Sequence, residues 1–514
     1  MKSPALSSNL VNKLCEVLWA AALICLPVTA FPLFEKLTGA LVAPLSILPI
    51  FLLFILWGLP LIIRKGKLPR ESLPLVVFAL VVILSCATAY FFFIPGFKGK
   101  SVPGQEIRAL FTLAVGLTFF LTTTTWVRDL NHFKNSWKYL TIGGAISIAW
   151  GGLQAFFILS HAPAYPAWLV QIQSWLSVRS PSFSSQFGRV NGLTYEASWF
   201  AHQMVMIYLP LWMADTYHKT SAFKFRVLRL SVENIFLVLG LGVFFLSSPR
   251  IGLVSLFLMV IYFFVRLNIA FYRKIMQNIM ARISSVKGKA RLINRTYIGV
   301  FTSLFIVLVY ALLIGGVFLL ATQRDWRLSL LISKPPTLQE IIGVLTLNQN
   351  TLLDLSHRFI FLERMVYWFN GWNVFSRYPW LGVGLGNAGF FFPQMAPALG
   401  WSSFEIRNVL YYLTQLPNVK SFWFRLLAET GLVGFSIFIT WFYILFQSSR
   451  YAQHHQDATI RTFALAGQLA LLAFIGEGFS IDSFAMPYFW IVAGLVAATG
   501  MFVRRELSQN QGSA

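Results

Sequence analysis

The ionisable residues that could carry chemistry lie near the ends of long apolar runs, and few lie in the middle of one. This set comprises Glu196, Arg250, Arg364, Lys420, Arg425, Glu429, Glu477 and Asp482. A charged side chain at the bilayer centre costs roughly 2.5–3.5 kcal/mol, so charged residues in membrane segments are candidates for function. Guanidinium groups bind phosphate oxygens through paired hydrogen bonds. The set therefore predicts a site for an anionic ligand at the outer leaflet of a membrane.

Two arginines are the main candidates for binding that anion. Arg250 ends a four-residue turn, Ser247 to Arg250, between two apolar runs, and so short a turn favours a specific role. The alternative is an anchor that extends to the lipid headgroups. Arg364 lies in a segment of helical periodicity, where the alternative is the polar face of an amphipathic helix.

Lys420 and Arg425 lie where a long polar segment returns to an apolar run. A lysine among arginines in a partly dry site favours the neutral amine, which could act as a base. The alternative is a lysine that binds phosphate or anchors the chain. His161 and His357 are reserve candidates for a base.

The composition indicates which class of fold positions these residues. The 514 residues are 57% hydrophobic and 11% charged, with a mean hydropathy of +0.67, whereas soluble proteins carry about 25% charged residues. The sequence therefore predicts an all-α polytopic membrane protein with about twelve transmembrane helices. The expected spans are 15–34, 39–63, 73–95, 109–126, 139–158, 197–217, 232–248, 251–267, 297–321, 426–446, 460–479 and 484–503.

The net charge of +23 follows from basic residues clustered in alternate loops. This is the positive-inside pattern, so we expect both termini to be cytoplasmic and no nucleic acid to bind. The first apolar run is long enough to be a retained helix rather than a cleaved signal peptide. The three cysteines fall inside apolar runs and are expected to be packing residues.

We expect residues 1–514 to form a single integral membrane domain, with residues 322–425 as one large periplasmic loop. Within this loop, apolar residues recur at helical spacing, which predicts an amphipathic helix at the membrane surface capped by Asp354. Its face comprises Leu355, Phe359, Leu362, Val366, Phe369 and Asn373. The sequence Gly384 to Gly389 matches a dinucleotide-binding pattern, but no strand precedes it, so a flexible turn is expected.

Residues 185–450 resemble the O-antigen polymerase and ligase superfamily, the Wzy and WaaL proteins of bacterial surface polysaccharide assembly. The likeness is carried in order by Gly192–Ser198, Ser248–Gly252, Arg364–Trp368 with Tyr378–Gly384, and Trp423–Gly434. The first five helices add only topology. The resemblance implies a multi-pass protein of the bacterial inner membrane with its site facing the periplasm.

The resemblance further implies transfer of a polyprenyl-diphosphate-linked oligosaccharide to an acceptor hydroxyl, with no metal or nucleotide cofactor. Arg250, Arg364 and Arg425 would bind the diphosphate, and Lys420 or Glu196 would activate the hydroxyl. Besides the lipid bilayer, a chain-length regulator and a flippase of the same pathway are the partners it suggests.

Ligases of this family carry a histidine where this chain has Lys420. This difference favours a polymerase. The alternatives are a ligase that transfers the glycan to lipid A core and a lipid-linked glycan flippase or transporter.

Overall fold

A computed structural model describes residues 9–38, 43–65, 68–179, 188–247, 249–282 and 326–512, and residues 301, 304–305, 307–308, 310–312, 315–316, 318–319 and 322. The chain divides into two compact units. The larger unit holds residues 1–255 and 361–514, and the smaller unit holds residues 256–360.

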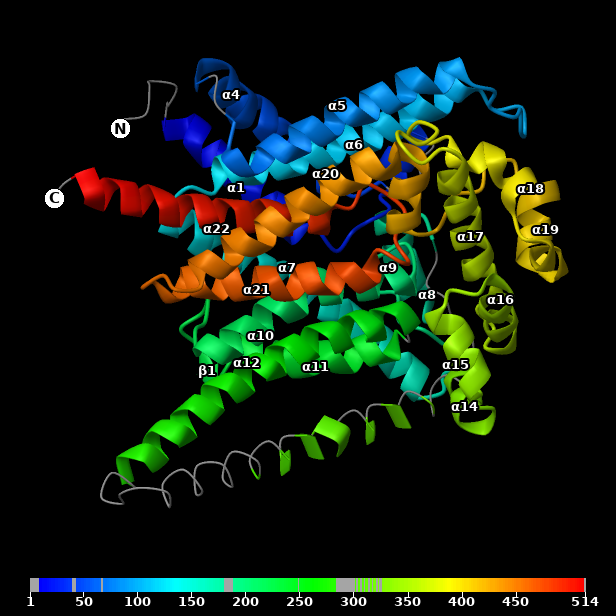
Figure 1. Ribbon diagram of the computed structural model, residues 1–514. Helices are drawn as coiled ribbons and strands as arrows, with labels where there is room; N and C mark the ends of the chain where they lie inside the picture. The colour runs from blue at the N-terminus through cyan, green and yellow to red at the C-terminus, as the bar shows by residue number, and fades with distance from the viewer. Residues whose placement is uncertain are drawn as a thin grey trace. The chain divides into compact units, whose positions relative to one another are not determined.

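The larger unit is a bundle of long helices (Figure 1). Its first part contains α1 Asn9–Ile24, α2 Pro32–Thr38, α3 Ile47–Leu53, η1 Phe54–Gly58, α4 Leu59–Lys65, η2 Arg70–Ser72, α5 Leu73–Thr88, η3 Ala89–Phe91, α6 Val102–Trp126, α7 Leu130–Leu159, α8 Ala167–Leu176, α9 Ala197–Gln203, η4 Met204–Tyr208, α10 Leu209–His218 and α11 Val232–Leu246. Its second part contains α17 Leu362–Arg377, η5 Ala388–Phe391, α18 Phe392–Met395, η6 Ala398–Ser402, α19 Phe404–Tyr411, α20 Phe422–Ala452, α21 Ala458–Glu477 and α22 Pro487–Gly512.

Strands are nearly absent from the described residues. β1 Arg226–Val227 and β2 Leu230–Ser231 form an antiparallel hairpin. Its turn residues Leu228 and Arg229 both have positive φ, as the twist of a two-residue hairpin requires. The predicted all-α class is confirmed.

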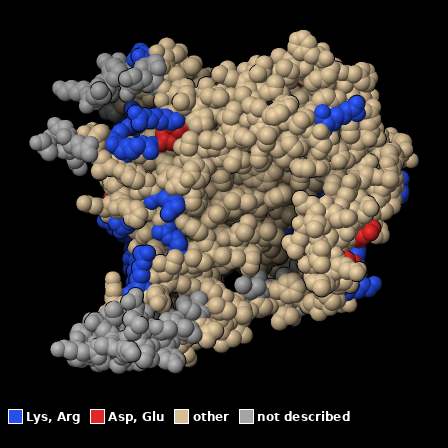
Figure 2. All heavy atoms as spheres, viewed as in Figure 1, with Lys and Arg blue, Asp and Glu red and all other residues tan. Residues whose placement is uncertain are grey.

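Eight helical segments among the described residues are long and apolar enough to cross a membrane, so this is an integral membrane protein. They are Ile47–Arg64, Arg70–Phe91, Val102–Trp126, Leu130–Leu159, Arg250–Lys274, Phe422–Ala452, Ala458–Glu477 and Pro487–Gln509. On the face shown in Figure 2, Lys and Arg gather near the end of α22, beside a broad band without charged side chains. The orientation and the count of twelve spans stay predictions.

The four other expected spans are not among these eight segments, each for a different reason. The run 15–34 is not one helix, because α1 ends at Ile24 before a turn that contains Pro27, which has no backbone N–H to continue the ladder. Residues 197–217 are helical but nearly all buried, and they pack against α7, α11, α21 and α22. α11 has only 15 residues. The run 297–321 lies largely outside the described residues.

The smaller unit contains α14 Trp326–Ser333, α15 Leu338–Leu345 and α16 Gln349–Arg358, and α12 Arg250–Arg282 runs into it. Thr337 and Glu340 form a capping box at the start of α15, each satisfying a backbone N–H of the other. Arg358 Nη2 lies 2.7 Å from Glu340 Oε1 and joins α16 to this cap. The hydrogen bonds from Arg358 and Thr337 lower the pKa of the Glu340 carboxyl.

The predicted amphipathic helix through 355–373 is wrong as one continuous element. α16 ends at Arg358, α17 begins at Leu362, and Ile360 between them has a φ of 54° that no helix tolerates. Asp354 lies inside α16, which is capped by Asn348 instead. Leu362 and Val366 are buried within the larger unit, so periodicity had identified an inward-facing stripe.

Candidate active site

Asp482, in the loop between α21 and α22, belongs to a cluster of charged residues. The charges of Arg425, Arg364, Lys420 and Glu196 all act on its carboxyl. The structure therefore brings together four of the five predicted site residues. Desolvation raises the pKa of Asp482, and the three cations oppose this rise without cancelling it.

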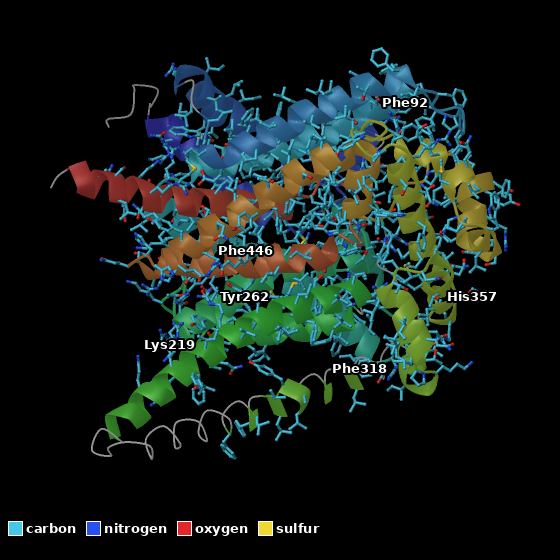
Figure 3. All side chains as sticks on the ribbon, in the orientation of Figure 1. Phe92, Lys219, Tyr262, Phe318, His357 and Phe446 are labelled. Atoms are coloured by element: carbon cyan, nitrogen blue, oxygen red, sulfur yellow. The ribbon has the colours of Figure 1, made fainter. Side chains whose placement is uncertain are left out.

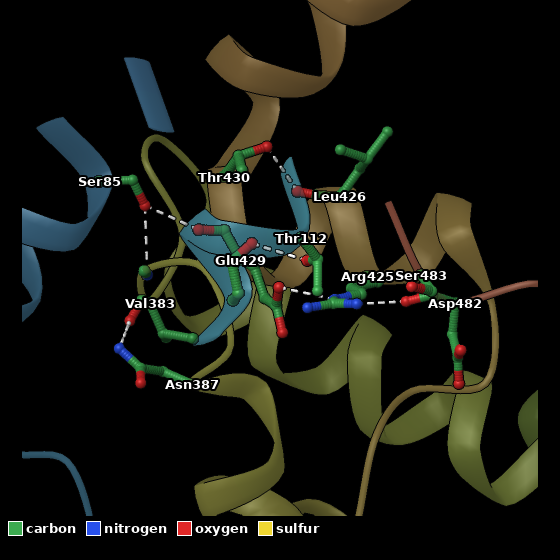
Figure 4. A network of polar contacts seen from close by, with 12 residues as sticks. Ser85, Thr112, Val383, Asn387, Arg425, Leu426, Glu429, Thr430, Asp482 and Ser483 are labelled. Atoms are coloured by element: carbon green, nitrogen blue, oxygen red, sulfur yellow. Dashed lines mark hydrogen bonds and ion pairs between the residues drawn. The ribbon is translucent and has the colours of Figure 1, made fainter. Parts of the chain in front are cut away.

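Arg425 lies in the first turn of α20 and is held on two sides. Its Nε atom is 2.8 Å from Glu429 Oε2, one helical turn further along, and its Nη1 atom donates to the Asp482 backbone carbonyl. Figure 4 shows these contacts and the Asp482 side chain pointing away from Arg425. Both Arg425 and Glu429 are largely buried, so each charge depends on the other.

Lys420 lies two residues before the start of α20 and has a left-handed backbone, with a φ of 48°. The next residue, Ser421, caps α20 and donates from Oγ to the carbonyl of Gly478 at 3.1 Å. The Phe422 N–H donates to the same carbonyl at 2.7 Å. These bonds fix the segment against the end of α21, which explains how a non-glycine residue is kept in this conformation.

The Lys420 side chain forms an ion pair. Its Nζ atom is 2.5 Å from Glu405 Oε1 and 4.3 Å from the centroid of the Tyr367 ring, and Tyr367 Oη donates to Glu405 Oε1 at 3.1 Å. Burial alone would raise the pKa of the Glu405 carboxyl, but Lys420 and the hydrogen bond from Tyr367 lower it below its ordinary value. The Lys420 ammonium group therefore contacts both a carboxylate and the face of an aromatic ring.

Arg364 lies in α17 and donates weakly from Nη1 to the Lys420 carbonyl, at 3.5 Å. Within the described part of the chain, no carboxylate lies within 4.0 Å of the Arg364 guanidinium. Arg425 and Lys420, by contrast, each have a glutamate partner. Arg364 is therefore the cation of the cluster best able to accept an incoming anion.

Glu196 stands at the start of α9, and two side chains orient its carboxylate. Arg179 Nη1 is 3.1 Å from Oε2, and Ser198 Oγ donates to Oε1 at 2.8 Å. The carboxylate remains 41% exposed, so a hydroxyl group could still approach it.

Arg250 is the first residue of α12 and is half-buried, while the preceding Ser248 lies outside the described residues. A Cβ atom on Gly476 would lie 2.5 Å from Ser255 Oγ, so the start of α12 packs against the end of α21. Arg250 therefore lies at the same end of the bundle as the Asp482 cluster. Its binding role stays a prediction.

A turn that contains Gly382, Gly384 and Gly386, here called the glycine turn, holds the part of α20 that bears Arg425 and Glu429. Gly431 interrupts the helix, with φ 63° and ψ −168°. The Val383 and Gly384 N–H groups donate to the carbonyls of Ala428 and Glu429 at 3.0 and 3.1 Å. Ser85 Oγ donates to the Glu429 carbonyl at 2.7 Å (Figure 4). The turn thus satisfies carbonyls near the interruption.

Gly384 and Gly386 have φ values of 86° and 92°, which agree with the predicted turn. Asn387 Nδ2 donates to the buried Glu106 of α6 at 2.8 Å, and the Phe92 ring stacks on Tyr378 with centroids 4.6 Å apart. The turn is therefore braced from α6 and from the chain that follows α5.

The sequence did not predict three members of the cluster, and it identified a fourth, Asp482, without assigning it a role. Glu405, Tyr367 and Arg179 are partners of predicted residues, but no spacing in the sequence relates them. Asp482 was recognised as a charge at a helix end, and its place beside a short loop between two spans was the available signal. Of the reserve bases, His161 follows α7 with a positive φ, and His357 belongs to α16 of the smaller unit.

The cluster combines groups that can bind an anion with carboxylates that can accept a proton. A family model described as O-Antigen ligase (Wzy_C) matches residues 235–439. The matched segment includes Arg250, Arg364, Lys420 and Arg425, and it confirms the predicted family resemblance. No curated protein matches the chain.

Proposed function

Because residues 235–439 match the O-antigen ligase family, we propose that this protein is a membrane glycosyltransferase of the O-antigen polymerase type. It transfers a polyprenyl-diphosphate-linked glycan to a sugar hydroxyl of the acceptor. The protein lies in the bacterial inner membrane, and the site faces the periplasm. The observation that carries the proposal is that Arg364 contacts Lys420 and Arg425 contacts Asp482, so that these charged residues lie together at one end of the bundle.

The reaction needs charge stabilisation more than it needs a strong nucleophile. The acceptor oxygen attacks the anomeric carbon of the donor, and the bond from that carbon to the phosphate oxygen breaks. Polyprenyl diphosphate leaves with the bonding electron pair, and the hydroxyl proton passes to a base. Fixed cations that meet the developing negative charge are the main source of acceleration in such a step.

The residues divide into an anion side and a base side. Arg364, which has no ion-pair partner among the described residues, binds the diphosphate with Arg425 and Arg250 in support. Glu196 accepts the proton of the acceptor hydroxyl, since its carboxylate is oriented and exposed. Lys420 stays an alternative base, although its ion pair with Glu405 favours a binding role.

Asp482 is a further candidate for the base. Its pKa is raised by desolvation, which makes the carboxylate a better proton acceptor. It lies among the cations, so it could act on a hydroxyl next to the diphosphate.

The ligase is the alternative, in which lipid A core replaces a growing glycan as acceptor. The presence of Lys420 where ligases of this family carry histidine favours the polymerase. A flippase or transporter gains no support from the family match.

Reconstitution tests the proposal. The full-length protein in nanodiscs, supplied with a polyprenyl-diphosphate-linked repeat unit, should release polyprenyl diphosphate and form a ladder of longer glycans. Transfer to added lipid A core without a ladder would support the ligase, and no transfer to either acceptor would overturn the proposal.

A variant in cells tests the anion side. Arg250→Ala should abolish glycan lengthening while the protein still inserts and accumulates, because a diphosphate contact is lost. Lys224→Ala, which removes an exposed cation from the β1–β2 region, should leave lengthening unchanged. Normal polymer from the Arg250→Ala strain would contradict the assigned role.

A further inference from the structure

An aromatic strip is exposed on α19 and the turns on either side of it. Phe404, Tyr411 and Tyr412 are 74%, 67% and 78% exposed, and Trp401 is 36% exposed. Phe404 and Tyr411 lie on α19, Trp401 lies in η6 and Tyr412 follows α19, and four exposed aromatic side chains so close in the chain are a surface feature of the kind that marks a binding site.

The strip is held rigidly. Ile406, Val409 and Leu410 bury the opposite face of α19. Arg407 Nη1 donates to the carbonyls of Trp401 and Ser402 at 2.8 and 3.0 Å, which fixes the turn before α19 to the helix. The rings of Trp401 and Tyr411 contact each other, with centroids 6.0 Å apart. A platform ordered in advance binds its ligand with little loss of conformational entropy.

The position of α19 argues against lipid tails as the partner. Within the larger unit, α19 lies beyond the ends of α20 and α21 that adjoin the site (Figure 1). Aromatic residues of a membrane belt lie instead at the level where helices leave the hydrocarbon. The flanking polar side chains Arg407, Asn408 and Thr414 also suit a hydrated partner.

The strip is continuous with the candidate active site. Glu405 follows Phe404 directly and pairs with Lys420 at 2.5 Å. Ser403, at the start of α19, donates to Glu363 Oε1 at 2.8 Å, and Glu363 is the neighbour of Arg364 in α17. A chain bound along α19 would therefore end next to the cluster.

We propose that Trp401, Phe404, Tyr411 and Tyr412 form a binding platform for the glycan chain of the substrate. One face of a pyranose ring presents C–H groups that pack on an aromatic ring, while its hydroxyls bond to nearby polar groups. This inference rests on the proposed glycan transfer and adds a second contact region, away from the diphosphate. The platform holds the chain while the cluster holds the reacting end.

The test separates binding from turnover. Thr414→Cys, labelled with an environment-sensitive fluorophore, places a reporter on an exposed position beside the platform. The probe is the soluble oligosaccharide released by mild acid from the lipid-linked glycan of the strain that carries this gene. Titration into the full-length protein in nanodiscs should change the fluorescence, and adding Trp401→Ala with Tyr411→Ala should weaken binding about tenfold.

Kinetics give a second readout. The Trp401→Ala, Tyr411→Ala variant should raise KM for the glycan acceptor about tenfold and leave kcat nearly unchanged, because the contacts form in the ground state as well. Trp175→Ala, which removes an exposed tryptophan of α8, is the matched control and should change neither constant.

Three results would overturn the platform. The first is an unchanged affinity for the oligosaccharide in the double variant, and the second is an equal loss of affinity in the Trp175→Ala control. The third is quenching of the reporter by brominated lipids, which would place the strip in the membrane. Failure of the proposed function would look different, because no glycan product would form although the oligosaccharide still binds through Trp401 and Tyr411.

Discussion

At the site end of the larger unit, the Asp482 cluster contains four cations and four carboxylates. Three cation–carboxylate pairs lie within 3.1 Å: Arg179 with Glu196, Lys420 with Glu405, and Arg425 with Glu429. The side chains of Arg364 and Asp482 form no such pair among the described residues. At the other end, Asp215 of α10 and Glu233 of α11 are both fully buried. Lys219, close to these two acids in the chain, and Phe92, beside the glycine turn, mark the two ends (Figure 3).

The two acids at the far end have local donors. Glu233 accepts from the Ala222 N–H and the Ser221 hydroxyl, each at 2.7 Å, and Asp215 accepts from Trp137 Nε1 at 2.9 Å. These bonds fasten the segment between α10 and α11 to the bundle. Both ends therefore contain buried carboxylates. At the far end they accept hydrogen bonds from neutral donors, whereas the site end adds cations, one of which, Arg364, makes only a weak hydrogen bond at 3.5 Å.

Breaking the Arg425–Glu429 pair should have the largest effect. Arg425→Ala leaves Glu429 buried without its partner, which should cost about 3–5 kcal/mol of stability. The thermal midpoint in detergent should fall, and glycan transfer should be lost. The double variant Arg425→Met, Glu429→Leu should recover much of the stability but not the activity. Recovery of activity as well would make the pair purely structural and remove the contrast between the two ends.

Removing the unpaired cation should separate activity from stability. Arg364→Ala should reduce kcat by about 10²–10³ through the loss of one group that stabilises developing charge. Its thermal midpoint should change little, because Arg364 makes only a weak hydrogen bond at 3.5 Å. Arg364→Lys should retain part of the activity.

Asp215→Asn is the matched control at the far end, since the amide keeps one oxygen to accept from Trp137. Asp215→Asn should lower the thermal midpoint and leave kcat within a few-fold of the unsubstituted protein. A large loss of kcat in Asp215→Asn, or none in Arg364→Ala, would contradict the comparison.

The sequence predicted charged residues that the structure brings near Asp482, but it did not predict the side chains that pair with them. Arg364, Lys420, Arg425 and Glu196 were found because a charge at the end of an apolar run has few structural reasons to be there. Glu405 and Tyr367 were missed because they meet Lys420 only after α17 and α19 fold together. The all-α class followed from composition, whereas the helix through 355–373 failed because periodicity reports a buried face and does not detect a break such as Ile360.

A substitution at Gly431, which interrupts α20, should have the next largest effect. A Cβ atom on Gly431 would lie 2.2 Å from the Trp380 carbonyl oxygen, in a backbone region that side chains rarely adopt. Gly431→Ala should therefore cost about 1–3 kcal/mol and reduce transfer, because the strain falls next to Glu429.

Gly242→Ala in α11 is the matched control, since no atom lies within 4 Å of its Cβ position. In a helix interior this change should be neutral or stabilise by up to about 1 kcal/mol. Equal destabilisation by both changes would show that the interruption has no special role.

The smallest effect should come from pH, through Glu405. Its pKa in the folded protein lies below the ordinary glutamate value of 4.5, so its ion pair with Lys420 is fully formed above pH 4.5 and is lost as the pH falls through the lowered value. Activity should thus be insensitive to this pair near neutrality and decline only in acid. Glu405→Gln should remove this acid limb and, since Gln still accepts from Tyr367, leave the thermal midpoint nearly unchanged. Lys420→Arg keeps the cation and should retain activity if Lys420 binds phosphate. Loss of activity in Lys420→Arg, together with a shift of the profile to lower pH in Glu405→Gln, would instead assign Lys420 as the base, because removing the carboxylate favours the neutral amine.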